Sequence, residues 1–210
     1  MVEYGRSCYE RKKSMPVFSV ESLSVPQVRA LYYGRMQEDF PPDEIKTLGV
    51  IERGMSRGEY FCLGAVAGED ILAYAFFVRR REEAREYALF DYLAVKKEIR
   101  CQGVGSAFLR ALIAGPLKNM AAVLLEVDDP ACARDPAEQE IRNRRLGFYL
   151  RNGLTDTSVI ATVWGVQFRI LALPVGVCPS AEETRRMYAA LYRVIMPPKM
   201  FESKVLIHGS

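Results

Sequence analysis

Residues 89–113 constrain the fold most, because they predict a strand, a glycine-containing turn and a helix in immediate succession. The apolar run 89–95 is typical of a buried strand, and apolar residues recur at helical spacing across 104–113. Between them, residues 100–105 read Arg-Cys-Gln-Gly-Val-Gly. Two glycines let the backbone approach a ligand closely, and the free N–H groups and dipole of a helix start favour an anion. The segment therefore predicts a pyrophosphate site, to which Arg100 would add a positive charge.

Two other phosphate-binding turns fit this segment less well. A dinucleotide-binding turn needs a third glycine where this chain has Phe108, and a nucleoside-triphosphate loop needs Gly-Lys-Ser/Thr where residues 105–107 are Gly-Ser-Ala. The segment resembles instead the signature of the GNAT superfamily of acyl-CoA-dependent N-acetyltransferases, whose Arg/Gln-x-x-Gly-x-Gly/Ala turn binds the pyrophosphate of coenzyme A. The sequence Phe-Tyr-Leu-Arg-Asn-Gly-Leu at 148–154 is similar to the second signature of that family, and the resemblance covers about 17–173.

The resemblance implies an α/β (α+β) fold of the GNAT acyl-CoA N-acyltransferase type. Such a fold has a mixed central sheet, flanking helices and two parallel strands, here 89–95 and 121–127, that splay apart. Apolar periodicity, capping residues and turns predict the other elements in a matching order. Strands are expected at 17–23, 60–66, 72–79, 159–164 and 166–173, and helices at 24–39, 43–52, 135–152 and 180–195.

We interpret residues 1–210 as a single acetyltransferase domain. Its core would span about 17–173, followed by a C-terminal helical extension of about 176–210. The first dozen residues and the tail after Pro198 are expected to be loosely held. The final helix has an apolar face that can cover a sheet edge or a partner, so a homodimer is left open.

Composition and charge agree with an enzyme of this kind. Half of the 210 residues are hydrophobic, which suffices for a substantial core, and the formal net charge of +3 is too mild to indicate a nucleic-acid or membrane partner. No apolar stretch near the N-terminus has the length of a signal peptide. The most apolar region, 158–178, is interrupted by polar residues as in a β-hairpin, and is too polar to span a membrane. We therefore expect a cytoplasmic protein.

Cysteine and histidine usage argues against a metal site and a disulfide framework. The five cysteines form no Cys-x-x-Cys pair, and their odd number suggests reduced thiols. The single histidine, His208, lies near the C-terminus, so a zinc site or a Ser-His-Asp triad would lack its usual ligand or base. No metal cofactor is predicted.

The resemblance implies acetyl-CoA as the cosubstrate and assigns residues to it by position. The pantetheine arm would lie between the splayed strands. There the backbone of Leu93, Ala94 and Val95 would bind pantetheine and the thioester oxygen. The pyrophosphate loop would consist of Arg100, Cys101, Gln102, Gly103, Val104, Gly105 and Ser106.

Tyr149 matches the family tyrosine whose hydroxyl lies near the thioester sulfur and protonates the departing thiolate. The alternative is core packing, since a Phe-Tyr pair late in an amphipathic helix commonly serves that purpose. One departure from the family pattern stands close by. The family often has an asparagine seven residues before this tyrosine, whereas this chain has Arg142 there and Asn143 one step away. The sequence assigns no role to Arg142.

The general base has two candidates, Asp91 and Glu126. Asp91 alternates with Leu89, Leu93 and Val95 on one expected strand face, and Glu126 interrupts the apolar run 121–127. A buried strand normally avoids carboxylates, and burial raises the pKa of a carboxylic acid towards a value useful for accepting a proton from an ammonium group. The alternative is a structural ion pair. Asp91 is slightly favoured, because it lies beside the segment expected to bind the thioester.

Two functions of different classes remain open at this level. The first is an N-acetyltransferase in which a primary amine of a small molecule or protein attacks acetyl-CoA directly in a ternary complex. The second is a non-catalytic acyl-CoA-binding sensor or scaffold. The acceptor is not specified by the sequence. The regions that shape its pocket in the family contain a mixture of aromatic and acidic residues: Tyr32, Tyr33, Asp39, Phe40, Glu44 and Trp164.

Overall fold

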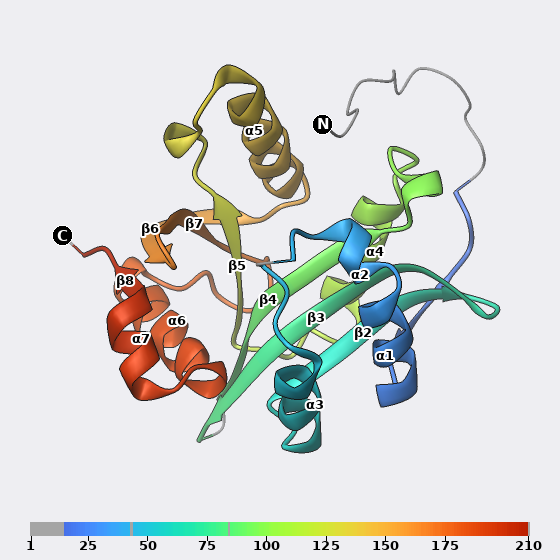
Figure 1. The fold of residues 1–210 in the computed structure, drawn as a ribbon, viewed down its shortest axis with the longest axis horizontal. Coiled ribbons are helices and arrows are strands. Elements are labelled where there is room, and N and C mark those ends of the chain that lie inside the picture. The colour runs from blue at the N-terminus through green and yellow to red at the C-terminus, as the bar shows by residue number, and fades with distance from the viewer. Residues whose placement is uncertain (1–14, 43, 84, 210) are drawn as a thin grey trace.

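A mixed β-sheet with helices on both faces is the central feature of the computed structural model (Figure 1). The model describes residues 15–42, 44–83 and 85–209. These residues form eight strands in the order β1-β2-β3-β4-β5-β7-β6-β8. The neighbouring strands pair antiparallel except for β4 and β5, which are parallel. The predicted fold class is confirmed.

The strands and helices have the following bounds. The strands are β1 (Ser19–Ser22), β2 (Tyr60–Ala67), β3 (Asp70–Glu82), β4 (Arg85–Val95), β5 (Ala122–Asp128), β6 (Thr155–Val163), β7 (Val166–Ala172) and β8 (Val205–Ile207). The helices are α1 (Val25–Tyr33), α2 (Met36–Asp39), α3 (Leu48–Ser56), α4 (Val104–Ala114), α5 (Pro136–Arg151), α6 (Ala181–Ile195) and α7 (Pro198–Lys204). Short 3-10 turns occupy Lys97–Ile99 and Pro130–Cys132.

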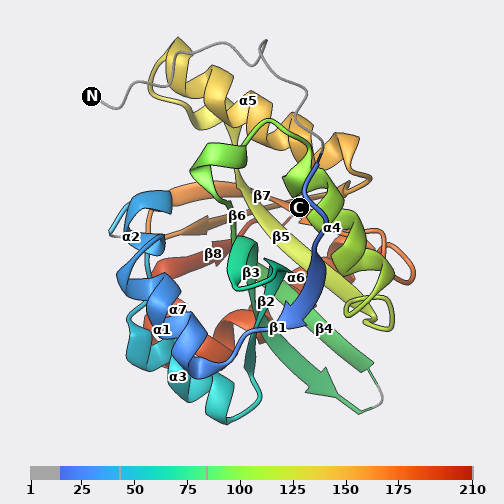
Figure 2. The same ribbon diagram turned by 90° about the vertical axis from the view of Figure 1, so that its right-hand side faces the viewer.

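Each face of the sheet carries its own buried cluster. On one face, here called the α6 face, Val28, Ile51 and Tyr188 pack from α1, α3 and α6. On the other, the α4 face, Phe108 and Tyr149 pack from α4 and α5. Figure 2 shows α1, α2 and α3 on one side of the sheet and α4 on the other. A side chain of a central strand therefore meets one of two different environments, according to its place in the alternation.

The parallel strands β4 and β5 separate within their length. They pair from Tyr87 with Ala122 to Phe90 with Leu125, and no further pair follows although both strands continue (Figure 1). We call this point the fork. Asp91 and Glu126 are the next residues on the two strands. The sheet thus opens at the position where both sequence-predicted carboxylates lie.

A β-bulge in β4 lies at the same point. Phe76 of β3 pairs with Tyr92 and Phe77 pairs with Phe90, so Asp91 has no partner in the register. The extra residue shifts the alternation: Leu89 and Tyr92 face the α6 cluster, whereas Leu93 and Val95 pack against the α4 cluster. The expected sharing of one face by Asp91, Leu93 and Val95 is therefore wrong, because strict alternation fails at a bulge.

Three other expectations differ from the structure. The helix predicted at 24–39 is divided into α1 and α2 at Gly34 and Arg35, where Gly34 leaves the helical conformation. The next helix, α3, begins at Leu48 instead of 43, and Asp43 itself lies outside the described residues. The tail after Pro198 forms α7 and β8, and β8 pairs with β6, because Phe201 is buried and anchors it. The first dozen residues lie outside the described part.

Candidate active site

The turn that follows β4 has the features of an anion site. Cys101 and Gly103 both have left-handed φ values, 63° and 84°, and Gly103 immediately precedes α4. No side chain caps this helix start among the described residues. A Cβ atom at Gly105 would lie 3.3 Å from Val95 Cγ2 and 3.5 Å from a ring carbon of Phe148. Gly103 is thus favoured by its conformation, a side chain at Gly105 would crowd Val95 and Phe148, and the first N–H groups of α4 stay open to a ligand.

The Arg100 side chain forms hydrogen bonds with two residues outside the turn. Its Nε donates to the Val95 carbonyl at 2.9 Å, and its Nη2 donates to Asp39 Oδ1 at 2.5 Å. The Tyr74 hydroxyl donates to the other Asp39 oxygen at 2.8 Å. The Arg100 charge is therefore already paired with a carboxylate at the end of α2, a contact that no sequence signal indicated. Binding of pyrophosphate by Arg100 stays a prediction.

Asp91 is held by a cation at the fork. Lys46, in the segment between α2 and α3, places Nζ 2.6 Å from Asp91 Oδ1, and the Tyr60 hydroxyl donates to Oδ2. The Asp91 side chain is only 5% exposed. Burial acts against the Lys46 ammonium, but the charge and hydrogen bond of Asp91 together with Tyr92 and Glu126 outweigh it, so the pKa of Lys46 is raised above its ordinary value. An enclosed carboxylate, Asp91, thus pairs with a partly exposed lysine, Lys46.

Glu126 is held by neutral donors from a different part of the chain. The hydroxyls of Tyr188 and Tyr192, both on α6, donate to Glu126 Oε1, that of Tyr192 at 2.6 Å. Burial raises the pKa of Glu126, although the two phenols and the nearby charge of Lys46 partly oppose this. The residue as a whole keeps intermediate exposure. Glu126 therefore combines a raised pKa with access from the fork, and no cation contacts it among the described residues.

Tyr149 lies near the end of α5 and packs on the α4 face. Its ring meets Phe148 edge to face at a centroid distance of 5.2 Å, and the residue is 9% exposed. Burial raises the pKa of Tyr149 to about 12, so its hydroxyl is protonated at neutral pH. No hydrogen bond joins this hydroxyl to another described residue. The structure therefore places Tyr149 across the sheet from the contacts of Asp91 and Glu126.

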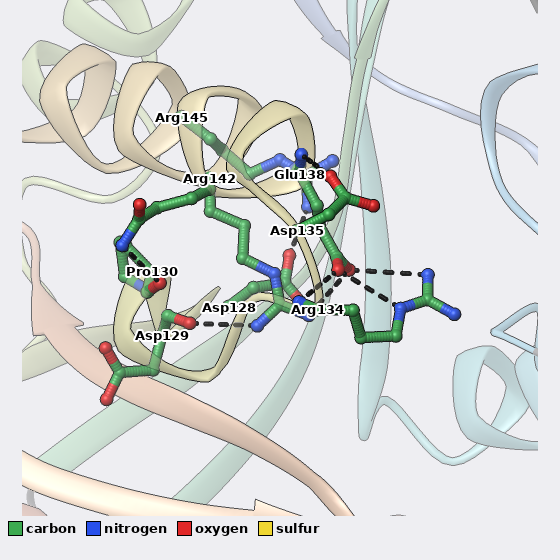
Figure 3. Close-up of polar contacts among 9 residues, drawn as sticks. Asp128, Asp129, Pro130, Arg134, Asp135, Glu138, Arg142 and Arg145 are labelled. Atoms are coloured by element: carbon green, nitrogen blue, oxygen red, sulfur yellow. Dashed lines mark hydrogen bonds and ion pairs between the residues drawn. The ribbon is translucent and has the colours of Figure 1, made fainter.

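Arg142 lies on α5 and contacts the connection between β5 and α5, as Figure 3 shows. It donates through Nη1 to the Asp129 carbonyl at 2.8 Å and through Nη2 to Glu138 Oε1 at 2.9 Å, and its side chain is 13% exposed. Asp135 caps α5 by accepting from the Glu138 backbone N–H. Arg142 thus braces the loop and the first turns of the helix that carries Tyr149.

Residues near the expected acceptor region fall into two groups. Phe40 packs edge to face on Tyr92 at 5.0 Å, beside the fork. Trp164 instead lies in the β6–β7 turn, where it is 56% exposed and Lys204 sits over its ring.

Within the described residues, no three Cys, His, Asp or Glu side chains are grouped as a metal site would require. Nor does that part of the chain contain a helix of the length and apolarity needed to cross a membrane.

Four functional candidates escaped sequence reasoning: Lys46, Tyr60, Tyr188 and Tyr192. Tyr188 and Tyr192 were visible only as part of the apolar face of the final helix. Two phenols at i and i+4 on such a face are a usable signal, because buried hydroxyls need a partner. Lys46 lies in an irregular segment, and no sequence pattern around it predicts a contact with Asp91.

The arrangement of β4, turn and α4 agrees with a direct comparison of sequences. Residues 25–134 match the model of the acetyltransferase (GNAT) family. The chain belongs to the GNAT acetyltransferase family. The ten residues predicted to bind the cofactor of a GNAT enzyme all lie in the last part of β4, the turn and the first turn of α4. Among curated proteins, no match to the sequence was found.

Solved GNAT structures share the fold at low sequence identity. A protein assigned to the GNAT family from Bacteroides thetaiotaomicron is 17% identical, with a TM-score of 0.61 over 84% of this chain and 97% of that one. The ribosomal-protein-S18-alanine N-acetyltransferase from Escherichia coli is 19% identical, with a TM-score of 0.54 over 77% and 96%. Arabidopsis thaliana NAA60 in complex with acetyl-CoA is 11% identical, with a TM-score of 0.55 over 74% and 97%.

Proposed function

We propose that this protein is an acetyl-CoA-dependent N-acetyltransferase that acetylates a primary amine by direct attack in a ternary complex. The observation that carries the proposal is the fork. There, two strands separate beside an anion-binding turn, and two carboxylates lie at the point of separation. A merely structural opening of the sheet would not require ionisable groups at its apex, where their desolvation is costly.

The cofactor is proposed to lie along the open edge of β4. Its pyrophosphate would bind the N–H groups of residues 100–106, and its pantetheine arm would follow Leu93, Ala94 and Val95, which β5 leaves unpaired. The thioester would then end near Asp91 and Glu126. The structure of NAA60 with acetyl-CoA, which shares the fold, supports this choice of cosubstrate.

Chemistry at the fork needs four groups with different tasks. An ammonium substrate must lose a proton before it attacks, and we assign this step to Glu126, because its pKa is raised and no cation contacts it. Asp91, slightly favoured from sequence, is better suited to hold a positive charge, since it already holds that of Lys46. Backbone N–H groups of β4 would stabilise the oxyanion, and Tyr149 would protonate the thiolate.

The acceptor is proposed to be a cationic primary amine of a small molecule or a protein. The acidic and aromatic surroundings of the fork, with Asp91, Glu126 and Tyr92, favour an ammonium group. One enzyme that shares the fold, by its name, acts on an alanine of ribosomal protein S18. Both classes of acceptor therefore belong in the test.

The experiment is a thiol-release assay with acetyl-CoA and a panel of amines, including polyamines, amino acids and peptides with free N-termini. In parallel, calorimetry measures the binding of CoA to the wild-type protein and to the Gly105→Glu variant. We expect thiol release with at least one amine, and loss of CoA binding in a folded Gly105→Glu variant, because its side chain would press on Val95 and Phe148 beside the turn and bring a negative charge to the proposed anion site. CoA binding without thiol release would favour the non-catalytic binding module. Absence of CoA binding would overturn both functions.

A further inference from the structure

Lys46 stands where the proposed reaction needs an amine. Its backbone N–H donates to the Tyr92 hydroxyl at 2.9 Å, which anchors this irregular segment to β4. From there its side chain reaches the fork, with Nζ 2.6 Å from Asp91 Oδ1 and 5.3 Å from the centroid of the Tyr92 ring. Its charge also acts on Glu126. The ammonium of Lys46 thus occupies the surroundings proposed above for the acceptor ammonium.

We propose that Lys46 is itself an acetyl acceptor, acetylated by the acetyl-CoA that is bound to the same chain. This inference rests on the proposed function, because it uses the same cofactor and the same fork. Its consequence is a modified residue inside the active site, where the acetylated side chain no longer carries the charge that Asp91 holds.

A second lysine provides a matched comparison within the molecule. Lys96 directly follows β4 and, like Lys46, pairs with a carboxylate, that of Asp70. The two lysines have similar side-chain exposure, 28% for Lys46 and 34% for Lys96. Asp70, however, begins β3, on the side of β4 away from β5. Lys96 therefore resembles Lys46 in exposure and pairing and differs from it in its distance from the fork.

The transfer balances with groups already present. The Lys46 ammonium loses one proton to water, which leaves a neutral amine with a lone pair. Nζ then forms a bond to the acetyl carbonyl carbon, and the bond between that carbon and sulfur breaks. A second nitrogen proton leaves with the departing thiolate as the CoA thiol. The products are one acetyl-lysine, one CoA thiol and one proton.

Non-enzymatic acetylation would label Lys46 less than an ordinary lysine. Acetyl-CoA in solution reacts with neutral amines, and the raised pKa of Lys46 makes its neutral form scarcer than that of an ordinary lysine. Preferential labelling of Lys46 would therefore require a positioned thioester.

The test is incubation of the purified full chain with ¹³C-labelled acetyl-CoA and no amine, followed by peptide mass spectrometry. We expect the label at Lys46 to exceed that at Lys96 by at least about tenfold, and the two to become equal in chain unfolded with urea. Excess CoA should suppress labelling of Lys46. The labelled fraction at a given time should not depend on protein concentration. Lys46→Arg should abolish the excess label, with the remaining lysines unaffected.

Equal labelling of Lys46 and Lys96 in the folded chain, or labelling of Lys46 that excess CoA does not reduce, would overturn self-acetylation. The amine panel run in parallel separates this from the proposed function. Turnover of an external amine with Lys46 unlabelled overturns self-acetylation alone. Labelled Lys46 without turnover of any amine supports self-acetylation and overturns the external acceptor.

Discussion

Asp91 and Glu126 follow the last paired residues of two neighbouring strands, yet their surroundings differ in kind. Asp91 contacts the ammonium of Lys46, and its side chain is almost fully enclosed. Glu126 accepts hydrogen bonds from the phenols of Tyr188 and Tyr192 and keeps partial exposure. One carboxylate is neutralised by a charge from the N-terminal half of the chain, and the other is solvated by neutral hydroxyls from the C-terminal helix.

The difference teaches which carboxylate is better placed to accept a proton. A cation in contact stabilises the ionised form of a carboxylate, whereas burial with neutral donors leaves a net rise in pKa. For Glu126 that rise is the outcome, because burial outweighs its two hydroxyl donors. We therefore divide the roles, with Glu126 as the base and Asp91 as the group that holds positive charge.

The largest expected effect is on Glu126. Glu126→Gln should lower kcat by about 10⁴-fold, the upper end of the range for a positioned acid or base. It should also remove the acidic limb of the rate profile, since that limb reports ionisation of a base whose pKa is raised by burial. Steady-state rates from about pH 5 to 9 measure this. An intact limb in Glu126→Gln, with loss of the limb in Asp91→Asn, would reverse the two roles.

Tyr149→Phe tests the opposite face and should have the next largest effect. We expect kcat to fall by about 10²-fold, the lower end of the same range, because a thiolate leaves without an acid more readily than an amine attacks without a base. CoA affinity and melting temperature should not change, since the hydroxyl bonds to no other described residue and the ring still packs. Turnover within about twofold of wild type, with chemistry rate-limiting, would assign Tyr149 to core packing.

Asp91→Asn should affect binding and stability more than the chemical step. We expect the KM for a cationic amine to rise about tenfold, equivalent to about 1.4 kcal/mol. Stability should fall by about 1–3 kcal/mol, because the Lys46 ammonium loses its partner. Denaturant unfolding measures the second effect. Asp70→Asn is the matched control: its pair with Lys96 is more exposed, and its loss should cost less than about 1 kcal/mol.

The same pair predicts a pH dependence of stability. The folded-state pKa of Lys46 is raised, so its contribution is fully present below the unfolded value of about 10.4 and is lost as pH rises through the folded value. Tyr60 and Tyr92 also have raised pKa values and act in the same direction. The alkaline loss of stability should therefore be smaller, but not absent, in Asp91→Asn. An unchanged slope would show that the ion pair does not form.

Tyr192→Phe should have the smallest effect on turnover. It removes one of two donors to Glu126 Oε1 and so raises the pKa of that carboxyl further. The acidic limb should move to higher pH, while the rate on the plateau stays within about threefold of wild type. Tyr188→Phe, which removes the other donor, should move the limb in the same direction. An acidic limb at the wild-type pH in both variants would show that the hydroxyls of α6 do not affect the pKa of Glu126.

The sequence predicted the local strand, turn and helix around residues 89–113, because these depend on neighbours along the chain. The splayed strands followed from the family resemblance. The bulge at Asp91 was not predicted, since it arises from pairing with β3. The contacts of Lys46 and of α6 with the fork were not predicted for the same reason. Lys46 lies 45 positions from Asp91, and the two phenols of α6 lie more than 60 positions from Glu126. Pairing of β8 with the edge of β6 is likewise set by tertiary contact.

The hydrogen bonds from α6 to Glu126 have a consequence for how the enzyme is made. Their donors lie 62 and 66 residues after the acceptor. During synthesis, the turn, the fork and Tyr149 leave the ribosome before these two phenols do. A nascent chain that has folded as far as β7 therefore carries the proposed cofactor site without the groups that tune Glu126. A chain that terminates before Tyr188 lacks both phenols that contact Glu126.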